Sequence, residues 1–288
     1  MTLVRKLAGN APARPMPKGA TDCQMHMYLP GFASAPGALA LPAGVPGAED
    51  YRKVMAWLGL SRVVITQGNA HGRDHGNLIA CLGEMGDCAR GVAAIGPDVS
   101  DAEMARLHDA GVRGARIMDL PGGATGMADL AAVDARAAAH GWTLAVQFDG
   151  STILDQMAGL GALKSRFIID HHGKFHRGAA PGSVEIDAIK SLIDRGNCWF
   201  KFAGCYEATK TSGPDYPDIA SVARDIADFA PERLVWGTNW PHNMIRQTAD
   251  YPDDAHLLDL AMDWAGSDEA RRTMLVDSPA RLFGFARA

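Results

Sequence analysis

Eight short apolar runs, separated by segments with helical spacing, restrict the fold of this chain more than any other feature. The runs are mostly continuous, as expected of strands buried on both faces of a parallel sheet. The expected strands cover residues 21–26, 62–67, 91–95, 114–118, 143–148, 166–171, 198–202 and 234–237. The expected helices cover residues 49–58, 77–88, 100–110, 129–140, 185–193, 219–229 and 254–264, with a short closing helix over 278–283. This alternation predicts a (β/α)8 barrel, the TIM-barrel fold. A doubly wound sheet is the alternative, but no glycine-rich phosphate fingerprint follows the first expected strand.

The length of 288 residues and the 47% hydrophobic content suit one large domain. Residues 1–19 contain three prolines and no apolar core of a signal peptide, so we expect an irregular N-terminal arm. Residues 20–288 are predicted to form a single barrel domain. The Pro-, Gly- and Ala-rich stretch 30–47 predicts a long loop after the first strand, such as a lid.

Charge and cysteine content exclude several classes of partner. The formal net charge is −5 and there is no long basic run, so neither nucleic acid nor an anionic membrane is expected as a partner. No apolar run reaches the length that spans a membrane. The five cysteines are scattered and form no CxxC pair, which fits a reducing cytoplasm. The sequence leaves the oligomeric state open.

Polar side chains stand at the carboxyl ends of most expected strands, where barrel enzymes carry their active sites. A barrel core would usually have Val, Leu or Ile at many of these positions. Their convergence is hard to explain without a polar ligand. The residues at or just beyond the strand ends are Gln24, His26, Gln67, Asn69, Arg116, Gln147, Asp170, His171, His172, Lys201, Asn239 and His242.

Several of these residues have a structural alternative. His26 on its own could be a hydrogen-bonded core histidine. Adjacent residues on a strand face opposite ways, so one of His171 and His172 is expected to pack or cap. Lys201 stands between aromatic neighbours and therefore needs a buried partner or a ligand. Trp240, which precedes a proline, is expected to form a wall of the pocket.

Arg116, His71 and His75 lie at or next to these strand ends. Arg116 could form a structural ion pair with Asp119 or Asp22, or it could hold an anionic ligand. The residues themselves favour neither of these two roles. His71 and His75 follow the second expected strand in a loop, and we expect both at the surface.

Several of these motifs resemble the amidohydrolase superfamily. They are Gln24-Met25-His26, Asp170-His171-x-Gly173, Phe200-Lys201-Phe202 and Gly237-Thr238-Asn239-Trp240-Pro241. Within the superfamily they are most similar to the branch that contains 2-pyrone-4,6-dicarboxylate lactonase. The superfamily usually carries HxH on the first strand and Asp on the last, around metal ions. Here Gln24 and Asn239 replace two of those ligands. Amides are weak ligands, so we expect no metal and no cofactor.

Longer motifs at residues 22–30, 66–71, 115–123 and 236–243 resemble the galactarolactone isomerases of that branch. The resemblance implies an isomerase that converts D-galactaro-1,5-lactone to the 1,4-lactone, without metal, in galacturonate catabolism. The small-molecule partner is then a sugar-acid lactone. The implied catalytic residues are His26, His171, Lys201 and Asn239. The implied substrate-binding residues are Gln24, Gln67, Asn69, Arg116, Gln147, His172, Tyr206, Trp240 and His242.

Asn239 decides the expected chemistry, because an amide cannot take a proton from water as a carboxylate does. A hydroxyl of the substrate is then the expected nucleophile, and Asn239→Asp is expected to introduce hydrolysis. Arg116 and Lys201 would hold the carboxylate and the oxyanion, while His26 and His171 would move protons. Two alternatives remain: a sugar-acid lactone hydrolase with His171 or His242 as its base, and a non-catalytic sugar-acid binding barrel.

Overall fold

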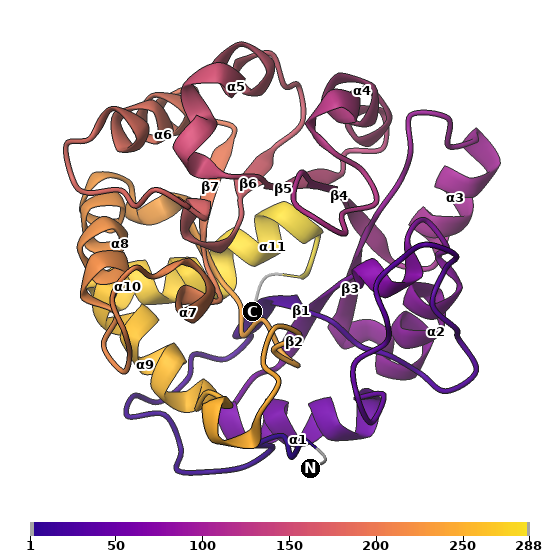
Figure 1. Ribbon diagram of the computed structural model, residues 1–288, viewed down its shortest axis with the longest axis horizontal. Helices are drawn as coiled ribbons and strands as arrows, with labels where there is room; N and C mark the ends of the chain where they lie inside the picture. The colour runs from indigo at the N-terminus through magenta and orange to yellow at the C-terminus, as the bar shows by residue number, and fades with distance from the viewer. Residues whose placement is uncertain (1–2, 287–288) are drawn as a thin grey trace.

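Eight parallel strands, hydrogen-bonded in chain order, form a barrel in the computed structural model, which describes residues 3–286 (Figure 1). The predicted TIM-barrel fold is therefore confirmed, and each expected strand is present with ends shifted by a few residues. The strands are β1 (Thr21–Met25), β2 (Arg62–Thr66), β3 (Ala89–Ala93), β4 (Val112–Met118), β5 (Thr143–Gln147), β6 (Phe167–Ile169), β7 (Cys198–Phe202) and β8 (Leu234–Trp236).

Most of the helices surround the barrel, as Figure 1 shows from one end. The helices are α1 (Ala48–Leu58), α2 (Gly76–Met85), α3 (Asp101–Asp109), α4 (Leu130–Ala139), α5 (Ile153–Gly161), α6 (Val184–Asp194), α7 (Cys205–Ala208), α8 (Pro217–Phe229), α9 (Asp254–Ala265), α10 (Asp268–Arg272) and α11 (Ser278–Phe283). Three of them, α5, α7 and α10, were not expected from the sequence. Gly159 and Gly161 weaken the helical signal of α5, and the other two are very short. None of the described helices is long and apolar enough to cross a membrane.

The seam between β8 and β1 closes the barrel beside Asn239. The Asn239 backbone N–H donates to Gln24 O at 2.7 Å, and the His26 N–H donates to Trp240 O at 2.7 Å. Gly237 permits this approach, since a Cβ there would lie 2.4 Å from the Cβ of Gln24. Asp22 holds the seam from below by accepting hydrogen bonds from Thr238 Oγ1 at 2.5 Å and from the Thr238 N–H at 3.1 Å.

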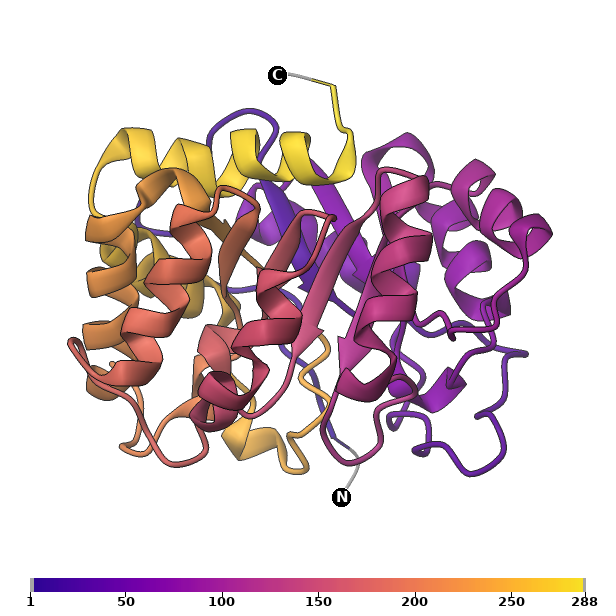
Figure 2. The ribbon, with the colours of Figure 1, turned by 90° about the horizontal axis from the view of Figure 1, so that it is seen from above.

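The amino end of the barrel is filled by apolar side chains. Cys23, Val64, Val92, Ala145, Ile168, Trp199 and Val235, from seven of the strands, form one buried cluster with Leu282 and Phe283 of α11. Figure 2 shows α11 lying across this end of the barrel. Hydrophobic packing therefore occupies the lower interior, and the carboxyl ends of the strands are left for other chemistry.

Candidate active site

A cavity of about 320 Å³ lies at the carboxyl ends of the strands, a size that suits a small-molecule ligand. Six of the residues predicted from the sequence line it: His26, Asn69, Arg116, Gln147, His171 and Asn239. They come from the ends of β1, β4 and β5 and from the loops after β2, β6 and β8. The structure thus brings together side chains that are more than 200 residues apart in the chain.

His26 is held in one tautomer by the backbone. Its Nδ1 lies 2.8 Å from Thr66 O, and a carbonyl only accepts, so Nδ1 carries the proton and Nε2 keeps a lone pair. Burial lowers the pKa of His26 to about 3, and the positive charge of Arg116 acts in the same direction. His26 is therefore a neutral imidazole at neutral pH and can accept a hydrogen bond or a proton.

Arg116 is a buried guanidinium whose hydrogen-bond partners are all uncharged. Nη1 donates to Gln67 O and Asn69 Oδ1, and Nη2 donates to Gln147 Oε1, each at 3.0 Å. Nη2 also lies 3.2 Å from Met118 Sδ. With 4% of its surface exposed, Arg116 gives the cavity a positive charge that suits an anionic ligand.

The structural ion pair considered for Arg116 is absent from the described chain. Asp119 Oδ1 instead accepts a hydrogen bond from the Met127 N–H, and Asp22 is committed to the seam. The ion pair that the sequence left open for Arg116 is therefore not formed, and its role toward a ligand stays a prediction.

Asn239 uses both hydrogens of its amide within the protein. Nδ2 lies 2.9 Å from Tyr206 Oη and 2.9 Å from Glu207 Oε1. The side chain lines the cavity, so its Oδ1 is the atom available to a ligand. The backbone of Asn239 has a φ of +63°, a left-handed conformation that Asn tolerates better than most residues.

The loop after β6 carries two more left-handed residues at the cavity. His171 has a φ of +51° and Lys174 a φ of +48°, and both side chains line the cavity. Burial lowers the pKa of His171 well below its usual range, with Lys174 and Lys201 adding to the effect. Such backbone strain, about 1–3 kcal/mol per residue, concentrates at functional sites.

An ion pair that the strand pattern did not predict also lines the cavity. Lys174 Nζ lies 2.8 Å from Glu207 Oε2, and the two side chains are 13% and 10% exposed. Among the described residues, Glu207 is the only carboxylate lining the cavity. Tyr28, Asn243 and Arg246 also line it and were not predicted. All five lie in loops or in α7, beyond the strand ends where polar residues were sought.

Three predicted residues lie deeper in the barrel than the cavity lining. Lys201, 1% exposed, has its Nζ 2.6 Å from Asp170 Oδ1 and 2.9 Å from Gln24 Oε1. The buried partner expected for this lysine is therefore present. Gln67 holds the following loop, because its amide donates to Gly72 O and accepts from the Ala94 N–H.

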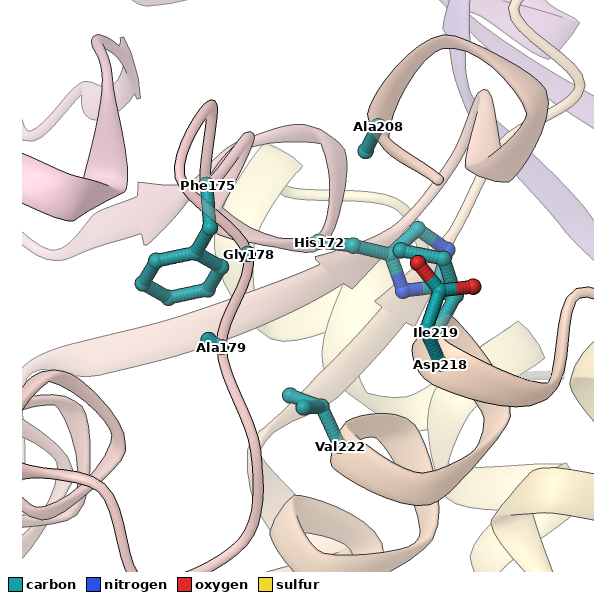
Figure 3. Close-up of a pocket in the computed structure, with 8 residues that line it drawn as sticks. All are labelled: His172, Phe175, Gly178, Ala179, Ala208, Asp218, Ile219 and Val222. Carbon is teal, nitrogen blue, oxygen red and sulfur yellow. The ribbon is translucent and has the colours of Figure 1, made fainter. Parts of the chain in front are cut away.

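His172 points away from the cavity, on the other side of the chain from His171. Its ring stacks on Phe202, with centroids 5.2 Å apart, and burial lowers its pKa to about 3. Figure 3 shows His172 beside Asp218 at a separate cavity of about 20 Å³, room for about one water molecule. Of the adjacent pair, His172 is thus the one that packs.

The remaining predicted residues stand behind the cavity wall. Trp240 is fully buried and packs against Tyr51, with ring centroids 5.3 Å apart. Tyr206 Oη lies 2.7 Å from His242 Nδ1, and His242 Nε2 lies 3.2 Å from Asp254 Oδ1. Tyr206 contacts Asn239 of the cavity lining directly, and His242 does so through Tyr206.

The expectation that His71 and His75 lie at the surface is wrong. They are 3% and 7% exposed. His71 packs beside the ring of Tyr28, and His75 Nδ1 lies 2.6 Å from Glu103 Oε1. The loop that carries them folds inward over the barrel, which its polar composition did not indicate.

The long loop after β1 forms an apolar wall of the cavity. Residues 39–43, Leu-Ala-Leu-Pro-Ala, line it, and Leu39 comes close enough to Gly122 that a Cβ there would lie 2.9 Å from Leu39 Cδ1. The loop therefore spans the mouth between β1 and the segment after β4. Its movement as a lid stays a prediction.

The donor set does not fit the metal centre usual in amidohydrolases. Across residues 3–286 there is no group of three or more His, Cys, Asp or Glu side chains arranged to hold a metal ion. His26 Nδ1 faces Thr66 O, and Gln24 Oε1 accepts from Lys201. An ammonium group thus occupies the neighbourhood of the first-strand amide, where a cation would be repelled.

Comparison with known proteins agrees with this architecture. The amidohydrolase family model matches residues 21–285. The D-galactarolactone isomerase of Agrobacterium fabrum is 54% identical over 98% of this chain and 96% of its own. A 2-pyrone-4,6-dicarboxylate hydrolase of Comamonas testosteroni is 31% identical over 94% and 93%. The crystal structure of an apo protein from Agrobacterium tumefaciens, 52% identical, superposes with a TM-score of 0.97 and covers 99% of this chain and 100% of its own.

Proposed function

Since this chain belongs to the amidohydrolase family, we propose that it is a lactone isomerase acting on D-galactaro-1,5-lactone and yielding D-galactaro-1,4-lactone. One observation carries the proposal. The cavity has a positively charged lining from Arg116 and Lys174, yet an amide, Asn239, stands where β8 would present a basic carboxylate. Such a site can bind an acidic lactone and polarise it, but it has no carboxylate at that position to activate water. The similarity to a named D-galactarolactone isomerase supports the same substrate.

The substrate carboxylate binds at Arg116. Arg116 Nη2 and Asn69 Nδ2 both point at the sulfur of Met118, at 3.2 and 2.9 Å. A thioether is a weak acceptor, so a ligand oxygen is a better partner for both donors. Charge-assisted hydrogen bonds to a carboxylate are about twice as strong as neutral ones.

The reaction is an internal acyl transfer. The 4-hydroxyl attacks C1 of the 1,5-lactone, a tetrahedral oxyanion forms, and the bond from C1 to the ring oxygen at C5 breaks. The proton lost by the 4-hydroxyl ends on the 5-oxygen, so no water is consumed. A hydroxyl held next to the carbonyl has an effective concentration on the order of 10⁵ M or more. A weak base therefore suffices.

Different side chains of the cavity carry out the separate parts of this reaction. His26 and His171, both kept neutral by burial, move the proton between the two oxygens. Asn239 Oδ1 and Gln147 orient hydroxyl groups from the cavity wall. Lys174, which lines the cavity and pairs with Glu207, supplies positive charge to the oxyanion, whereas Lys201 pairs with Asp170 beneath the cavity.

The proposal includes catalysis without a metal or cofactor, a place in galacturonate catabolism and a cytoplasmic location. The poor donor set supports the first, and the five free cysteines fit the last. The partner is one small lactone, with no nucleic acid or membrane. Elemental analysis that found one zinc per chain, with activity lost to a chelator and restored by zinc, would overturn the metal-free part.

An NMR time course on galactaro-1,5-lactone in weakly buffered solution tests the function. We expect signals of the 1,4-lactone to appear at an enzyme-dependent rate without acidification. Acidification and signals of open-chain galactarate would make the protein a hydrolase. Binding without any change beyond the uncatalysed rate would make it a sugar-acid binding barrel.

A further inference from the structure

The amide of Asn239 is oriented by two acceptors. Glu207 forms an ion pair with Lys174, whose Nζ lies 2.8 Å from the carboxylate oxygen Oε2, and its Oε1 lies 2.9 Å from Asn239 Nδ2. A carboxylate has lone pairs but no hydrogen to give. The atom that faces Oε1 must therefore carry a hydrogen, so the nitrogen and not the oxygen of Asn239 points to Glu207.

The second acceptor is fixed by a buried chain behind it. The carboxylate oxygen Oδ2 of Asp254 takes the hydrogen of His242 Nε2, at 3.3 Å, which leaves a lone pair on Nδ1. Tyr206 Oη, 2.7 Å from that Nδ1, donates its hydrogen there and accepts from Asn239 with its oxygen. His242 and Asp254 are fully buried, so this direction is not altered by solvent. Glu207 Oε1 and Tyr206 Oη thus both require a hydrogen-bond donor from residue 239.

We propose that Glu207 is a specificity-determining residue: it keeps position 239 uncharged, so that the nucleophile is the hydroxyl of the substrate and not water. This inference rests on the proposed isomerase function. In contrast to the expectation from the sequence alone, we therefore expect that a single exchange of Asn239 for Asp will not create a lactone hydrolase. The exchange has to be accompanied by the loss of the carboxylate at Glu207.

The physical reason is the distance between the two groups. A carboxyl group introduced at position 239 would place an oxygen about 3 Å from Glu207 Oε1, in the place of an N–H. Two carboxylates so close share one proton, as in paired catalytic carboxyls. Lys174 does not relieve this, because it binds the other oxygen of Glu207. The shared proton lies between the two groups, and the new carboxyl group is a poor base for water.

The test compares product partition in four proteins given galactaro-1,5-lactone at saturation: wild type, Glu207→Gln, Asn239→Asp and the double variant. The amounts of open-chain galactarate and 1,4-lactone are followed by NMR. We expect no hydrolysis by the first two and little by Asn239→Asp. The double variant should hydrolyse at least about tenfold faster than Asn239→Asp, because a glutamine amide donates to the new carboxylate and frees it to act as a base.

A charge-matched control is Asn239→Asp combined with Glu207→Asp, which keeps a negative charge at position 207. Its hydrolysis should stay well below that of the glutamine double variant. Asn239→Asp with Glu207→Met provides a second way to remove the carboxylate if the glutamine variant does not fold. Circular dichroism and lactone-dependent thermal shifts establish which variants are folded and bind substrate.

Two results would overturn the inference. Hydrolysis by Asn239→Asp alone that equals the double variant would show that Glu207 imposes no restraint. Folded, lactone-binding double variants that release no more galactarate than Asn239→Asp would show the same. A wild type that makes no 1,4-lactone would instead count against the proposed function, and the order of hydrolysis among the variants would still report on Glu207.

Discussion

The barrel interior contains two layers, and four strands contribute an apolar residue to one and a polar residue to the other. Along each of these strands the two residues are two positions apart and so share a face. The pairs are Val64 and Thr66, Ala145 and Gln147, Ile168 and Asp170, and Trp199 and Lys201. The apolar layer packs on α11, and the polar layer surrounds the floor of the cavity. The same backbone thus carries opposite chemistry within two residues.

Burial alone does not distinguish the layers, since Trp199 and Lys201 are each 1% exposed. The two layers differ in how the burial of these side chains affects the stability of the fold. Burying an indole stabilises the fold, whereas a buried ion pair such as Lys201 with Asp170 loses in desolvation much of what it gains in attraction. We therefore expect the lower layer to provide stability and the upper layer to provide function. The variants below test that assignment, from the largest expected effect to the smallest.

Trp199→Ala should have the largest effect on stability. It removes a fully buried side chain from the apolar layer, and such truncations cost about 3–5 kcal/mol. The free energy of unfolding in urea should fall by that amount, while kcat/KM of the folded fraction stays near wild type. A large loss of kcat/KM with normal stability would place function in the lower layer and break the comparison.

Asp22→Asn tests the seam that joins the layers. Burial raises the pKa of Asp22 to about 6 from 3.8, although hydrogen bonds from Thr238 and Gln24 oppose the rise. The folded protein therefore keeps this proton to a higher pH than the unfolded chain. That contribution to stability is complete below about pH 4 and is lost as the pH rises through about 6.

Urea unfolding of wild type and Asp22→Asn between pH 4 and pH 7 measures this contribution. The variant has no proton to lose at this position, so the stability of wild type relative to it should fall by up to about 3 kcal/mol over the range. Parallel curves for the two proteins would mean that Asp22 titrates as an ordinary carboxylate.

Arg116→Met should weaken substrate recognition in the upper layer. Removing a charge-assisted pair costs about 1.5–3 kcal/mol, so kcat/KM should fall about tenfold to a hundredfold. Arg246→Met is the matched control, because Arg246 is exposed at the rim and its charge is screened. Wild-type kinetics in Arg116→Met would show that this guanidinium is structural and that the carboxylate binds elsewhere.

His172→Gln tests whether a polar residue that packs outside the cavity contributes to stability or to function. His172 adjoins His171 in the chain but stacks on Phe202, outside the cavity. We expect a stability loss of about 1 kcal/mol and unchanged kcat/KM. A raised KM with unchanged stability would return His172 to the substrate-binding set that the sequence suggested.

The strands and most helices could be predicted because each depends on local periodicity, which the sequence displays directly. The strand ends also marked the polar layer, including Arg116 and Asn239. Glu207 was missed because it meets Asn239 only through the placement of α7, a helix of four residues with no periodic signal. Lys174 was missed because a left-handed turn after β6 directs it to the cavity.

The alternating positions of a strand also hide which polar residues are accessible. Lys201 and Gln24 fit the pattern of site residues, yet the hydrogen bond between them lies beneath the cavity. Their burial depends on how deep they lie in the barrel and on their partners from other strands, which the pattern of a single strand does not contain. The same limit explains the incorrect surface placement of His71 and His75.

Isomerisation in water enriched in ¹⁸O tests the central claim most directly. If the substrate hydroxyl attacks C1, the 1,4-lactone should form at the full enzymatic rate with no ¹⁸O in its carboxyl groups, as measured by mass spectrometry of the early product. Incorporation of ¹⁸O at C1, in the product molecules that keep the oxygen from water when ring closure expels one carboxylate oxygen, would mean that water opens the ring before it closes again. That result would contradict internal acyl transfer and the role assigned to Asn239.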